Sequence, residues 1–227
     1  APPATAPAPT PAAALEPELV SGAGKRIYHL TESGELAVEL DQRLGGLPNP
    51  SEAQDIWRGL WYEEAHHSTA IEGNTLVLEQ VEALLEQGRA VGNKELAEYL
   101  EVKGYADAAD WVYNQAIRPT MTAGTKAISI TELREIHRMT MAPAWDVAPH
   151  PNATNREQPG AFREHEIHPF PGGMTPPSWP LVPPAVDTWV SQANALTAQI
   201  ERLPEELAAL HAEFERIHPF LDGNGRT

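Results

Sequence analysis

The sequence predicts an all-α protein, a bundle of helices interrupted by one long irregular segment. Most of the chain between residues 51 and 217 repeats apolar residues at helical spacing. Strand-like alternation appears only weakly, around residues 162–167. Hydrophobic residues make up 41% of the 227 residues, enough for one sizeable core, so a wholly disordered chain is excluded.

Three parts are expected along the chain. Residues 1–20 are rich in Ala and Pro, a composition that cannot bury a core, and are expected to form a disordered tail. Residues 21–50 carry short apolar groups broken by Gly and Pro, which favours loops and one short helix. Residues 51–227 are expected to form the folded domain that carries the function.

Six helices are expected in the folded part, and local signals mark several of their ends. Ser51 with Gln54 forms a capping box before the first helix, and Ser129 with Glu132 forms another before the fourth. Gly88 is expected to end the second helix. The expected helices cover about 51–67, 77–88, 96–118, 129–140, 186–196 and 204–217.

Residues 141–190 break the helical pattern and hold eleven of the 22 prolines. An irregular stretch of this length inside a compact domain is usually a lid or a binding loop. We therefore expect this segment to lie at the functional site.

Composition excludes several classes of function. The 16 Lys and Arg residues stand against 32 Asp and Glu, a formal net charge of −16, whereas a nucleic-acid binder needs a basic face. Without any cysteine, neither a disulfide framework nor a thiolate metal site can form. No stretch reaches the roughly 18 continuous apolar residues of a membrane span. No basic and then apolar leader opens the sequence, so a cytoplasmic location is the default expectation.

The last ten residues, HPFLDGNGRT at 218–227, contain groups suited to binding phosphate. Gly223 and Gly225, on either side of Asn224, allow backbone N–H groups to point the same way and form an anion-binding nest. Arg226 adds a permanent cation that can donate two hydrogen bonds to phosphate oxygens. Taken alone, a Gly-Asn-Gly sequence is most often a simple turn, and an arginine behind it a solvated helix cap.

Two more groups in the same loop supply the rest of a reaction centre. Asp222 offers a hard carboxylate of the kind that holds Mg²⁺ on a bound phosphate. His218 is the nearby side chain that can accept a proton at neutral pH. Together, these groups predict the transfer of a phosphorus centre from a nucleotide to a hydroxyl.

HPFLDGNGRT resembles the signature of Fic-domain proteins, HxFx(D/E)GNGRxxR, whose members mostly transfer AMP from ATP to a protein hydroxyl. The resemblance covers most of residues 51–227 and implies a Fic fold, a helical bundle with a small β-hairpin flap. It implies that His218 deprotonates a Ser, Thr or Tyr hydroxyl of the target protein, and that Phe220 anchors the loop in the core. It further implies that Asp222 holds Mg²⁺ and that Arg226 contacts the nucleotide phosphates. The anion hole would be formed by Gly223, Asn224 and Gly225.

The chain departs from the signature at its end. The second arginine of the family would stand at position 229, whereas this sequence ends at Thr227. The family's following helix, whose N-terminal dipole would support the nest, is missing as well. The domain is therefore expected to be incomplete at the C-terminus of this chain.

An upstream segment, Ser68-Thr69-Ala70-Ile71-Glu72-Gly73, fits the family's inhibitory pattern (S/T)xxxE(G/N). The resemblance implies that Ser68, Glu72 and Gly73 form an intramolecular brake, in which the glutamate pairs with the second arginine and blocks productive placement of ATP. Taken alone, the pattern indicates no more than a helix end closed by Gly73.

The proline-rich segment between Pro159 and Gly173 resembles the family's flap. In the family, this short hairpin pairs its edge with an extended segment of the target through main-chain hydrogen bonds. The residues implied to dock the target are Phe162, Arg163, His165 and Ile167.

Two alternatives to AMP transfer stay open at this point. The loop binds phosphates rather than the base, so UMP transfer, phosphocholine transfer or removal of AMP fits it equally well. A non-catalytic nucleotide-binding or scaffold protein that keeps the fold is the second alternative. The expected ligands are ATP and Mg²⁺, and the expected partner is a target protein; a monomer and a homodimer are both open.

Overall fold

The computed structural model describes residues 54–116, 126–170, 172–196 and 202–227, besides four separate positions, Glu35, Val38, Glu39 and Gln42. The tail expected at residues 1–20 lies outside the described residues, as do most of residues 21–50 and the Ser51 capping box.

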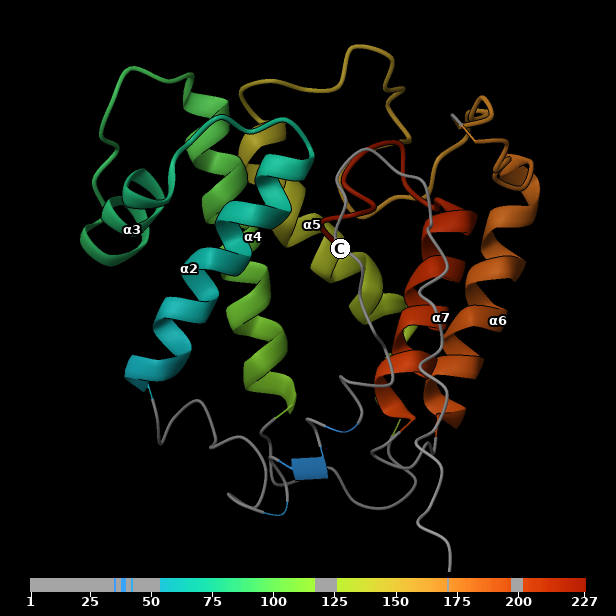
Figure 1. The fold of residues 1–227 in the computed structure, drawn as a ribbon. Helices are drawn as coiled ribbons and strands as arrows, with labels where there is room; N and C mark the ends of the chain where they lie inside the picture. Colours follow the sequence, from blue (N-terminus) through green and yellow to red (C-terminus); the bar gives the residue numbers. More distant parts are fainter. Residues whose placement is uncertain are drawn as a thin grey trace, which may run out of the picture.

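The described part of the chain is all-α, as predicted, and no described residue forms a strand. Six α-helices and one short 3-10 helix follow one another along it (Figure 1). The elements are α2 (Gln54–Ile71), α3 (Leu78–Gln87), α4 (Leu96–Ala116), α5 (Ile130–Trp145), η1 (Trp179–Leu181), α6 (Val182–Ala195) and α7 (Leu203–Ile217).

The helices form two groups that α5 joins. Helices α2, α3 and α4 pack on one another, and α6 packs along α7. Helix α5 contacts α4 on one side and α6 on the other. In Figure 1 the C-terminal loop, in red, lies in the region between the two groups. This arrangement brings the last residues of the chain close to helices that are far away in the sequence.

Each group of helices has its own apolar cluster. The cluster that we call the α2–α4 core consists of Ala65, Leu76, Val81, Tyr99 and Val102. The cluster that we call the α5–α7 core consists of Leu133, Val182, Val186, Val190, Phe214, Ile217 and Phe220. Phe220, a loop residue, is fully buried in the second cluster, so the C-terminal loop is held by packing as well as by hydrogen bonds.

Several helix ends agree with the sequence signals. The predicted capping box of α5 is confirmed: Ser129 Oγ accepts the N–H of Glu132 at 3.2 Å, and Glu132 Oε2 accepts the N–H of Ser129 at 2.9 Å. Gly88 ends α3 as predicted. Helix α6 begins earlier than expected, at Val182, because prolines in its first turn need no N–H partner.

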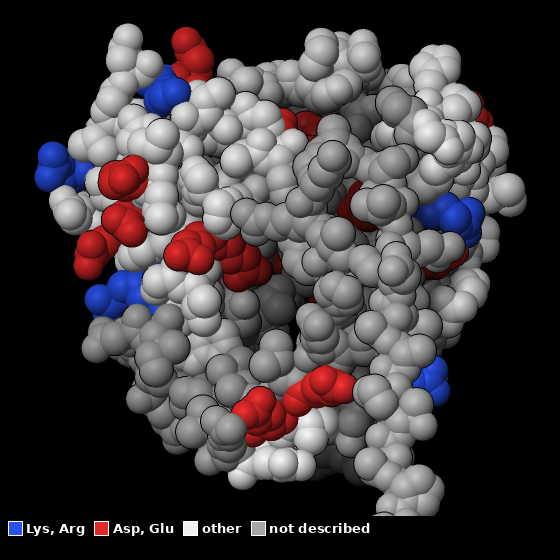
Figure 2. Space-filling model, in the orientation of Figure 1, with Lys and Arg blue, Asp and Glu red and all other residues white. Residues whose placement is uncertain are grey.

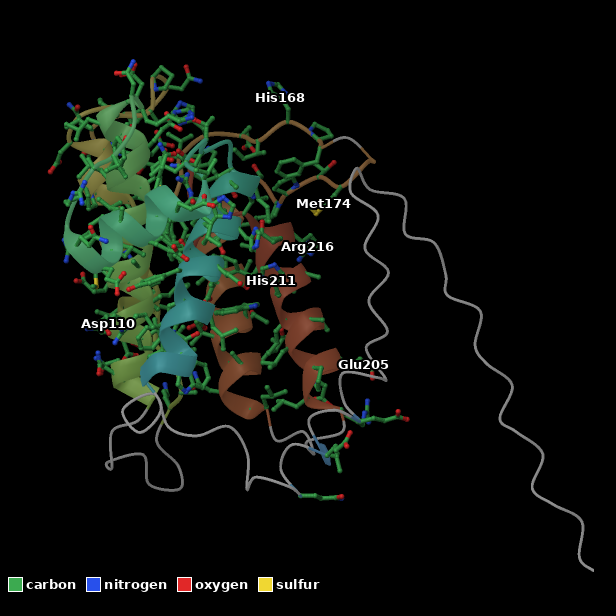
Figure 3. All side chains as sticks on the ribbon, turned by 60° about the vertical axis from the view of Figure 1, so that its left-hand side comes forward. Asp110, His168, Met174, Glu205, His211 and Arg216 are labelled. Carbon is green, nitrogen blue, oxygen red and sulfur yellow. The ribbon has the colours of Figure 1, made fainter. Side chains whose placement is uncertain are left out.

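The long segment between α5 and η1 contains no strand within its described residues. We call residues 160–177 the flap. Its predicted hairpin is reduced to a turn in which Phe170 donates its N–H to the carbonyl oxygen of Met174 at 2.8 Å. Pro169, Pro176 and Pro177 lack N–H groups, so this segment cannot build a longer ladder. Figure 3 shows His168 and Met174 on the flap, beyond the end of α7 that carries Arg216.

Charge is distributed unevenly over the surface. On the face drawn in Figure 2, acidic side chains gather on the side of α2, α3 and α4, while Lys and Arg lie towards the edges. Among the described helices, none combines the length and the apolar character that crossing a membrane requires.

Candidate active site

His218 stands where α7 ends and the C-terminal loop begins. Its N–H donates to the carbonyl oxygen of Phe214 at 3.0 Å. Its backbone angles, φ 49° and ψ 62°, are left-handed, which is uncommon for a residue other than glycine. The ring of Phe170, from the flap, lies edge-on at 5.0 Å from the imidazole. The helix end and the flap therefore meet at this histidine.

The surroundings of His218 favour its neutral form. Burial lowers the pKa of the imidazole, and the guanidinium of Arg163 lowers it further, while Asp222 opposes the shift. Nδ1 is buried without a hydrogen-bond partner among the described residues, and Oε2 of Glu215 lies 4.0 Å from it. A neutral imidazole that is 19% exposed can accept a proton at neutral pH.

The side chain of Asn224 closes the loop on itself. Its Oδ1 accepts the N–H of Phe220 at 2.8 Å, and its Nδ2 donates to the carbonyl oxygen of Phe220 at 2.9 Å. Next to it, Gly223 has a φ of 75° and faces the side chain of Met141, so a larger residue fits neither the backbone nor the space. The amide of Asn224 is thus structural, and only its backbone N–H is left for the predicted anion hole.

The backbone of the loop turns where the nest was predicted. Gly223 and Asn224 accept hydrogen bonds from the N–H groups of Arg226 and Thr227, at 3.3 Å and 3.1 Å, which begins a helical turn. The N–H groups of Asn224 and Gly225 at the start of this turn donate to no described residue. Gly225 is exposed. Free donors at the start of a helical turn attract an anion.

Asp222 and Arg226 are paired within the loop. Asp222 Oδ1 accepts the N–H of Gly223 at 2.6 Å and a guanidinium N–H of Arg226 at 3.0 Å. Arg226 is buried, and Glu101 of α4 lies 3.6 Å from its other terminal nitrogen. Its Nε is buried and has no partner among the described residues. The arginine predicted to contact phosphate is therefore held by two carboxylates here.

A buried histidine on α5, His137, packs against the loop; sequence reasoning missed it. His137 Nδ1 accepts the N–H of Gly160 at 2.7 Å, so its proton lies on Nε2, which donates to the carbonyl oxygen of Asp222 at 2.9 Å. Its ring stacks on Phe220 at 3.7 Å. Burial lowers the pKa of His137 to about 4. The sequence signal that could have revealed His137 is its place four residues after Leu133, on the apolar stripe of α5.

The inhibitory segment reaches the same loop from the other group of helices. Helix α2 ends in a Schellman motif, in which Gly73 donates to Ala70 and Asn74 donates to Thr69, both at 3.1 Å. This places the carboxylate of Glu72 over Gly225, with Oε1 2.5 Å from the position that a Cβ atom would take there. Glu72 therefore lies beside the free N–H groups of the nest.

Among the described residues, the Ser68 hydroxyl forms no hydrogen bond with the loop or with Glu72. Its hydroxyl donates to the hydroxyl of Tyr105 on α4 at 3.2 Å, and Tyr105 donates to Glu64 at 3.0 Å. Ser68 thus ties α2 to α4. Of the three residues expected in the inhibitory motif, Glu72 lies at the loop, Gly73 ends the helix and Ser68 holds it in place.

Two residues that the sequence did not indicate link the inhibitory segment to the arginine. Asn74 Nδ2 donates to the carbonyl oxygen of Glu98 at 2.8 Å and to Glu101 Oε2 at 2.9 Å. The other oxygen of Glu101 faces Arg226. A continuous polar chain therefore runs from the end of α2 to the loop.

The flap residues expected to dock a target fall into two sets. Arg163 is 1% exposed, so its side chain offers no surface to another protein, and the expectation for this residue is corrected. Phe162 packs on Phe220 with ring centroids 5.5 Å apart and is only partly buried. His165 and Ile167 are half-buried and stay in reach of a partner.

Buried charges anchor the base of the flap. Arg163 donates from its guanidinium to the carbonyl oxygens of His165, Pro177 and His218, at 2.7, 2.6 and 2.7 Å. Glu157 accepts the N–H of Glu164 at 2.7 Å and pairs with His165 Nδ1 at 2.5 Å. The first residues of the flap are therefore fixed on both sides.

The chain is similar to several known proteins. Residues 127–227 match the Fic/DOC family. Protein adenylyltransferase Fic of Nematostella vectensis is 34% identical over 174 residues, which is 74% of this chain and 35% of that protein. Protein adenylyltransferase fic-1 of Caenorhabditis elegans is 30% identical over 193 residues, 83% of this chain and 34% of that protein. The chain spans about a third of the length of these curated relatives.

Solved structures show the same architecture. Fic-1 from C. elegans superimposes with a TM-score of 0.62 at 27% identity, covering 87% of this chain and 52% of that one. A Fic domain containing signaling protein from Bacteroides thetaiotaomicron gives a TM-score of 0.63 at 22% identity, covering 87% and 68%, and supports the fold alone. Residues 127–227 of this chain therefore form a Fic domain and belong to the Fic/DOC family.

Proposed function

We propose that this protein transfers AMP from ATP to a hydroxyl group of a target protein. The observation that carries the proposal is the loop after α7, where a neutral, partly exposed His218 precedes two free backbone N–H donors, at Asn224 and Gly225. The names of the curated relatives, protein adenylyltransferase Fic, support the same chemistry.

His218 acts as the general base in this proposal. Its neutral imidazole takes the proton of the target hydroxyl as the hydroxyl oxygen forms a bond to the α-phosphorus of ATP. The bond between the α-phosphorus and the oxygen bridging to the β-phosphate breaks, and pyrophosphate leaves with that electron pair. The lowered pKa of His218 keeps the base unprotonated at neutral pH, which this step requires.

The nest and the arginine bind the phosphates. The N–H groups of Asn224 and Gly225 donate to phosphate oxygens and stabilise the charge that develops there. Arg226 takes part by exchanging Asp222 or Glu101 for a phosphate oxygen. This exchange replaces one anionic partner with another, so the buried guanidinium stays paired throughout.

Asp222 fits the role of a Mg²⁺ ligand. Its Oδ1 is used by Gly223 and Arg226, while Oδ2 accepts no hydrogen bond from a described residue. The described residues contain no cluster of three or more metal-binding side chains. Mg²⁺ at nucleotide sites commonly uses one or two carboxylates together with substrate phosphates, so one free carboxylate oxygen is sufficient. When bound, the ion would neutralise phosphate charge as pyrophosphate leaves.

Glu72 restrains the reaction in this proposal. Its carboxylate lies over Gly225, beside the N–H groups that would bind phosphate, so its charge repels the nucleotide and its atoms occupy the space. The Schellman motif and Asn74 hold the end of α2 in this position. Removal of the Glu72 side chain therefore admits ATP in a productive position.

The flap docks the target through its backbone. Beyond the anchored residues, residues 166–170 and 172–175 carry the main-chain groups that would pair with the target, and the ring of Phe170 lies 5.0 Å from the imidazole of His218. Main-chain pairing of this kind positions a hydroxyl with little dependence on the target sequence. His165 and Ile167 then border the docked segment.

The experiment incubates the protein that contains residues 1–227 with Mg²⁺ and ATP labelled on the α-phosphate. Wild type is compared with Glu72→Gly, His218→Ala and the double variant. Label on protein in Glu72→Gly that disappears in the double variant supports AMP transfer, the base and the brake together.

Two controls separate the alternatives. ATP labelled on the γ-phosphate reports phosphate transfer, and the mass of modified protein distinguishes AMP from UMP or phosphocholine. ATP binding with no label transferred in any variant would contradict the proposal and support a non-catalytic nucleotide-binding role. Label transfer that is equal in wild type and Glu72→Gly would reject the brake alone.

A further inference from the structure

Arg163 is a buried cation without a carboxylate partner among the described residues. Burying an unpaired charge is costly unless hydrogen bonds replace its water. The guanidinium instead lies at the C-terminal end of α7, where the last carbonyl oxygens have no partner within the helix and the helix dipole is negative. It donates to His218 at 2.7 Å and to Ile217 at 3.3 Å. The helix end therefore stabilises the cation.

The remaining hydrogen bonds of the Arg163 side chain go to the flap. One guanidinium nitrogen donates to His165 at 2.7 Å, and the other donates to Pro177 at 2.6 Å. These two residues stand near the beginning and the end of the flap. The backbone N–H of Arg163 also donates to the carbonyl oxygen of Pro219, directly after His218, at 2.9 Å. One side chain thus joins both arms of the flap to the backbone of the proposed base.

The backbone of His218 needs such support. A left-handed conformation is unfavourable for a residue with a Cβ atom, and it persists only where surrounding contacts enforce it. Arg163 bonds to the carbonyl oxygens of two successive residues, to His218 through its side chain and to Pro219 through its backbone N–H. Without these bonds, the backbone can relax and carry the imidazole away from its position beside Phe170.

We infer that Arg163 is a positioning residue that holds the imidazole of His218 in place and fixes the flap relative to it. The inference rests on the proposed function and deepens it, because it names what aligns the target hydroxyl with the base. Arg163 touches neither ATP nor the target in this role. It acts through the backbone of His218 and through the two arms of the flap.

Two substitutions separate the geometry of Arg163 from its charge. Arg163→Lys keeps a cation in the same place but cannot span the carbonyl oxygens that the guanidinium reaches. Arg163→Met removes the charge as well. Arg156→Met is the matched control, because the Arg156 side chain is 79% exposed and, among the described residues, pairs with Glu164 alone, at 3.5 Å.

The first readout is an NMR titration of the His218 imidazole, assigned with His218→Ala. The charged groups that face this ring are Arg163, Glu215 and Asp222. We expect the pKa of His218 to rise in both Arg163 variants, because an imidazole released from its position is less buried even where lysine keeps the charge, and to stay as in wild type in Arg156→Met. This titration does not depend on AMP transfer, so it tests the inference even if the proposed function fails.

The second readout is kinetic, in the Glu72→Gly background. We expect kcat to fall about 10–100-fold in both Arg163 variants, because displacement of a reacting group by about 1 Å has an effect of this size. KM for ATP should stay within about threefold, because Arg163 lies outside the nest. Millimolar guanidinium should restore part of the activity of Arg163→Met, since it fills the vacated space.

The outcomes distinguish the two ideas. Unchanged His218 titration and unchanged kcat in a folded Arg163→Lys protein would overturn the positioning role. Loss of ATP affinity in proportion to kcat would overturn it as well, since that result indicates general damage. Should Arg163→Met fail to fold, Arg163→Lys supplies the decisive kinetic comparison. Altered titration without AMP transfer in any variant would reject the proposed function and keep the positioning role.

Discussion

The carboxylate of Glu72 lies against Gly225, with Oε1 2.5 Å from the position of a Cβ atom at residue 225. The two residues belong to different groups of helices and are brought together only by the fold. The negative charge stands beside N–H donors that have no other partner among the described residues. Access of an anion to the loop therefore depends on the position of a single flexible side chain.

Replacing Glu72 by Gln tests whether charge or bulk restrains the loop. The variant keeps the shape over Gly225 and removes one negative charge near the phosphate site. We expect ATP to bind about fivefold more tightly, since two unit charges about 4 Å apart interact by about 1 kcal/mol in water. Isothermal titration calorimetry measures the change, and Glu63→Gln, an exposed position on α2, is the control. Equal affinities for Glu72→Gln and wild type would assign the restraint to bulk.

Replacing Asn224 by Ala opens the loop. The variant leaves the N–H and the carbonyl oxygen of Phe220 buried without their partner. We expect the free energy of unfolding to fall by about 2–4 kcal/mol, because each unsatisfied buried group costs about 1–3 kcal/mol. Urea unfolding measures the loss. A change below about 0.5 kcal/mol, the range of ordinary surface substitutions, would contradict the closing role of this amide.

Acidification should destabilise the protein through His137. Its pKa is about 4 in the folded state and 6.5 for an unperturbed histidine, so the unfolded state binds the extra proton first. The stabilisation that the neutral ring provides is fully present above pH 6.5. The free energy of unfolding then falls by about 3 kcal/mol as the pH drops towards 4.

His137→Gln removes this titration while keeping an acceptor and a donor in the side chain. Urea unfolding at several pH values should show a smaller slope between pH 6.5 and 4 in the variant than in wild type. His218, whose pKa is also lowered, contributes in the same direction in both proteins. His67→Gln, an exposed position on α2, should keep the slope of wild type. Equal slopes for wild type and His137→Gln would contradict the prediction.

Glu157 should affect the stability of the fold at a lower pH than His137 does. Burial alone would raise its pKa, but hydrogen bonds from His165, Glu164 and Thr154 outweigh this effect and lower it to about 2. A carboxylate with a lowered pKa stabilises the fold above its unfolded pKa of 4.5, and this contribution is lost as the pH falls from 4.5 towards 2.

Glu157→Gln should therefore be less stable than wild type at neutral pH, by about 2–3 kcal/mol, because an NH₂ group then faces donors. The gap between the two proteins should narrow below pH 4. Hydrogen exchange at the N–H of Glu164 should become faster at neutral pH. A constant gap from pH 7 to pH 2 would show that the carboxylate does not titrate as described.

Local signals in the sequence predicted the helices and the identity of the loop, because both depend on residues close together in the chain. The apolar spacing gave the six helices, and Ser129 with Glu132 gave the start of α5. The nest stays a prediction, made from glycines two positions apart. Phe220 was expected to anchor the loop, and it is fully buried.

Long-range partners could not be predicted in the same way. His137 and Gly160 meet across 23 residues, and Arg163 reaches His218 across 55. No local spacing records such pairs, so Arg163 was assigned to the surface of the flap although it is buried. Asn224 was assigned to the anion hole from the resemblance to the Fic signature, whereas its side chain forms hydrogen bonds inside the loop.

The two separate apolar clusters give the protein an uneven response to mutation. Glu72 is carried by the helices of the α2–α4 core, whereas His218 and Phe220 rest on the α5–α7 core. Substitutions that loosen Val81 or Val102 would shift the end of α2 before they disturb the loop. Under the proposed restraint by Glu72, such changes would appear in an evolving population as gains of activity rather than losses. Selection for restraint would then act on aliphatic residues that are far from any chemistry.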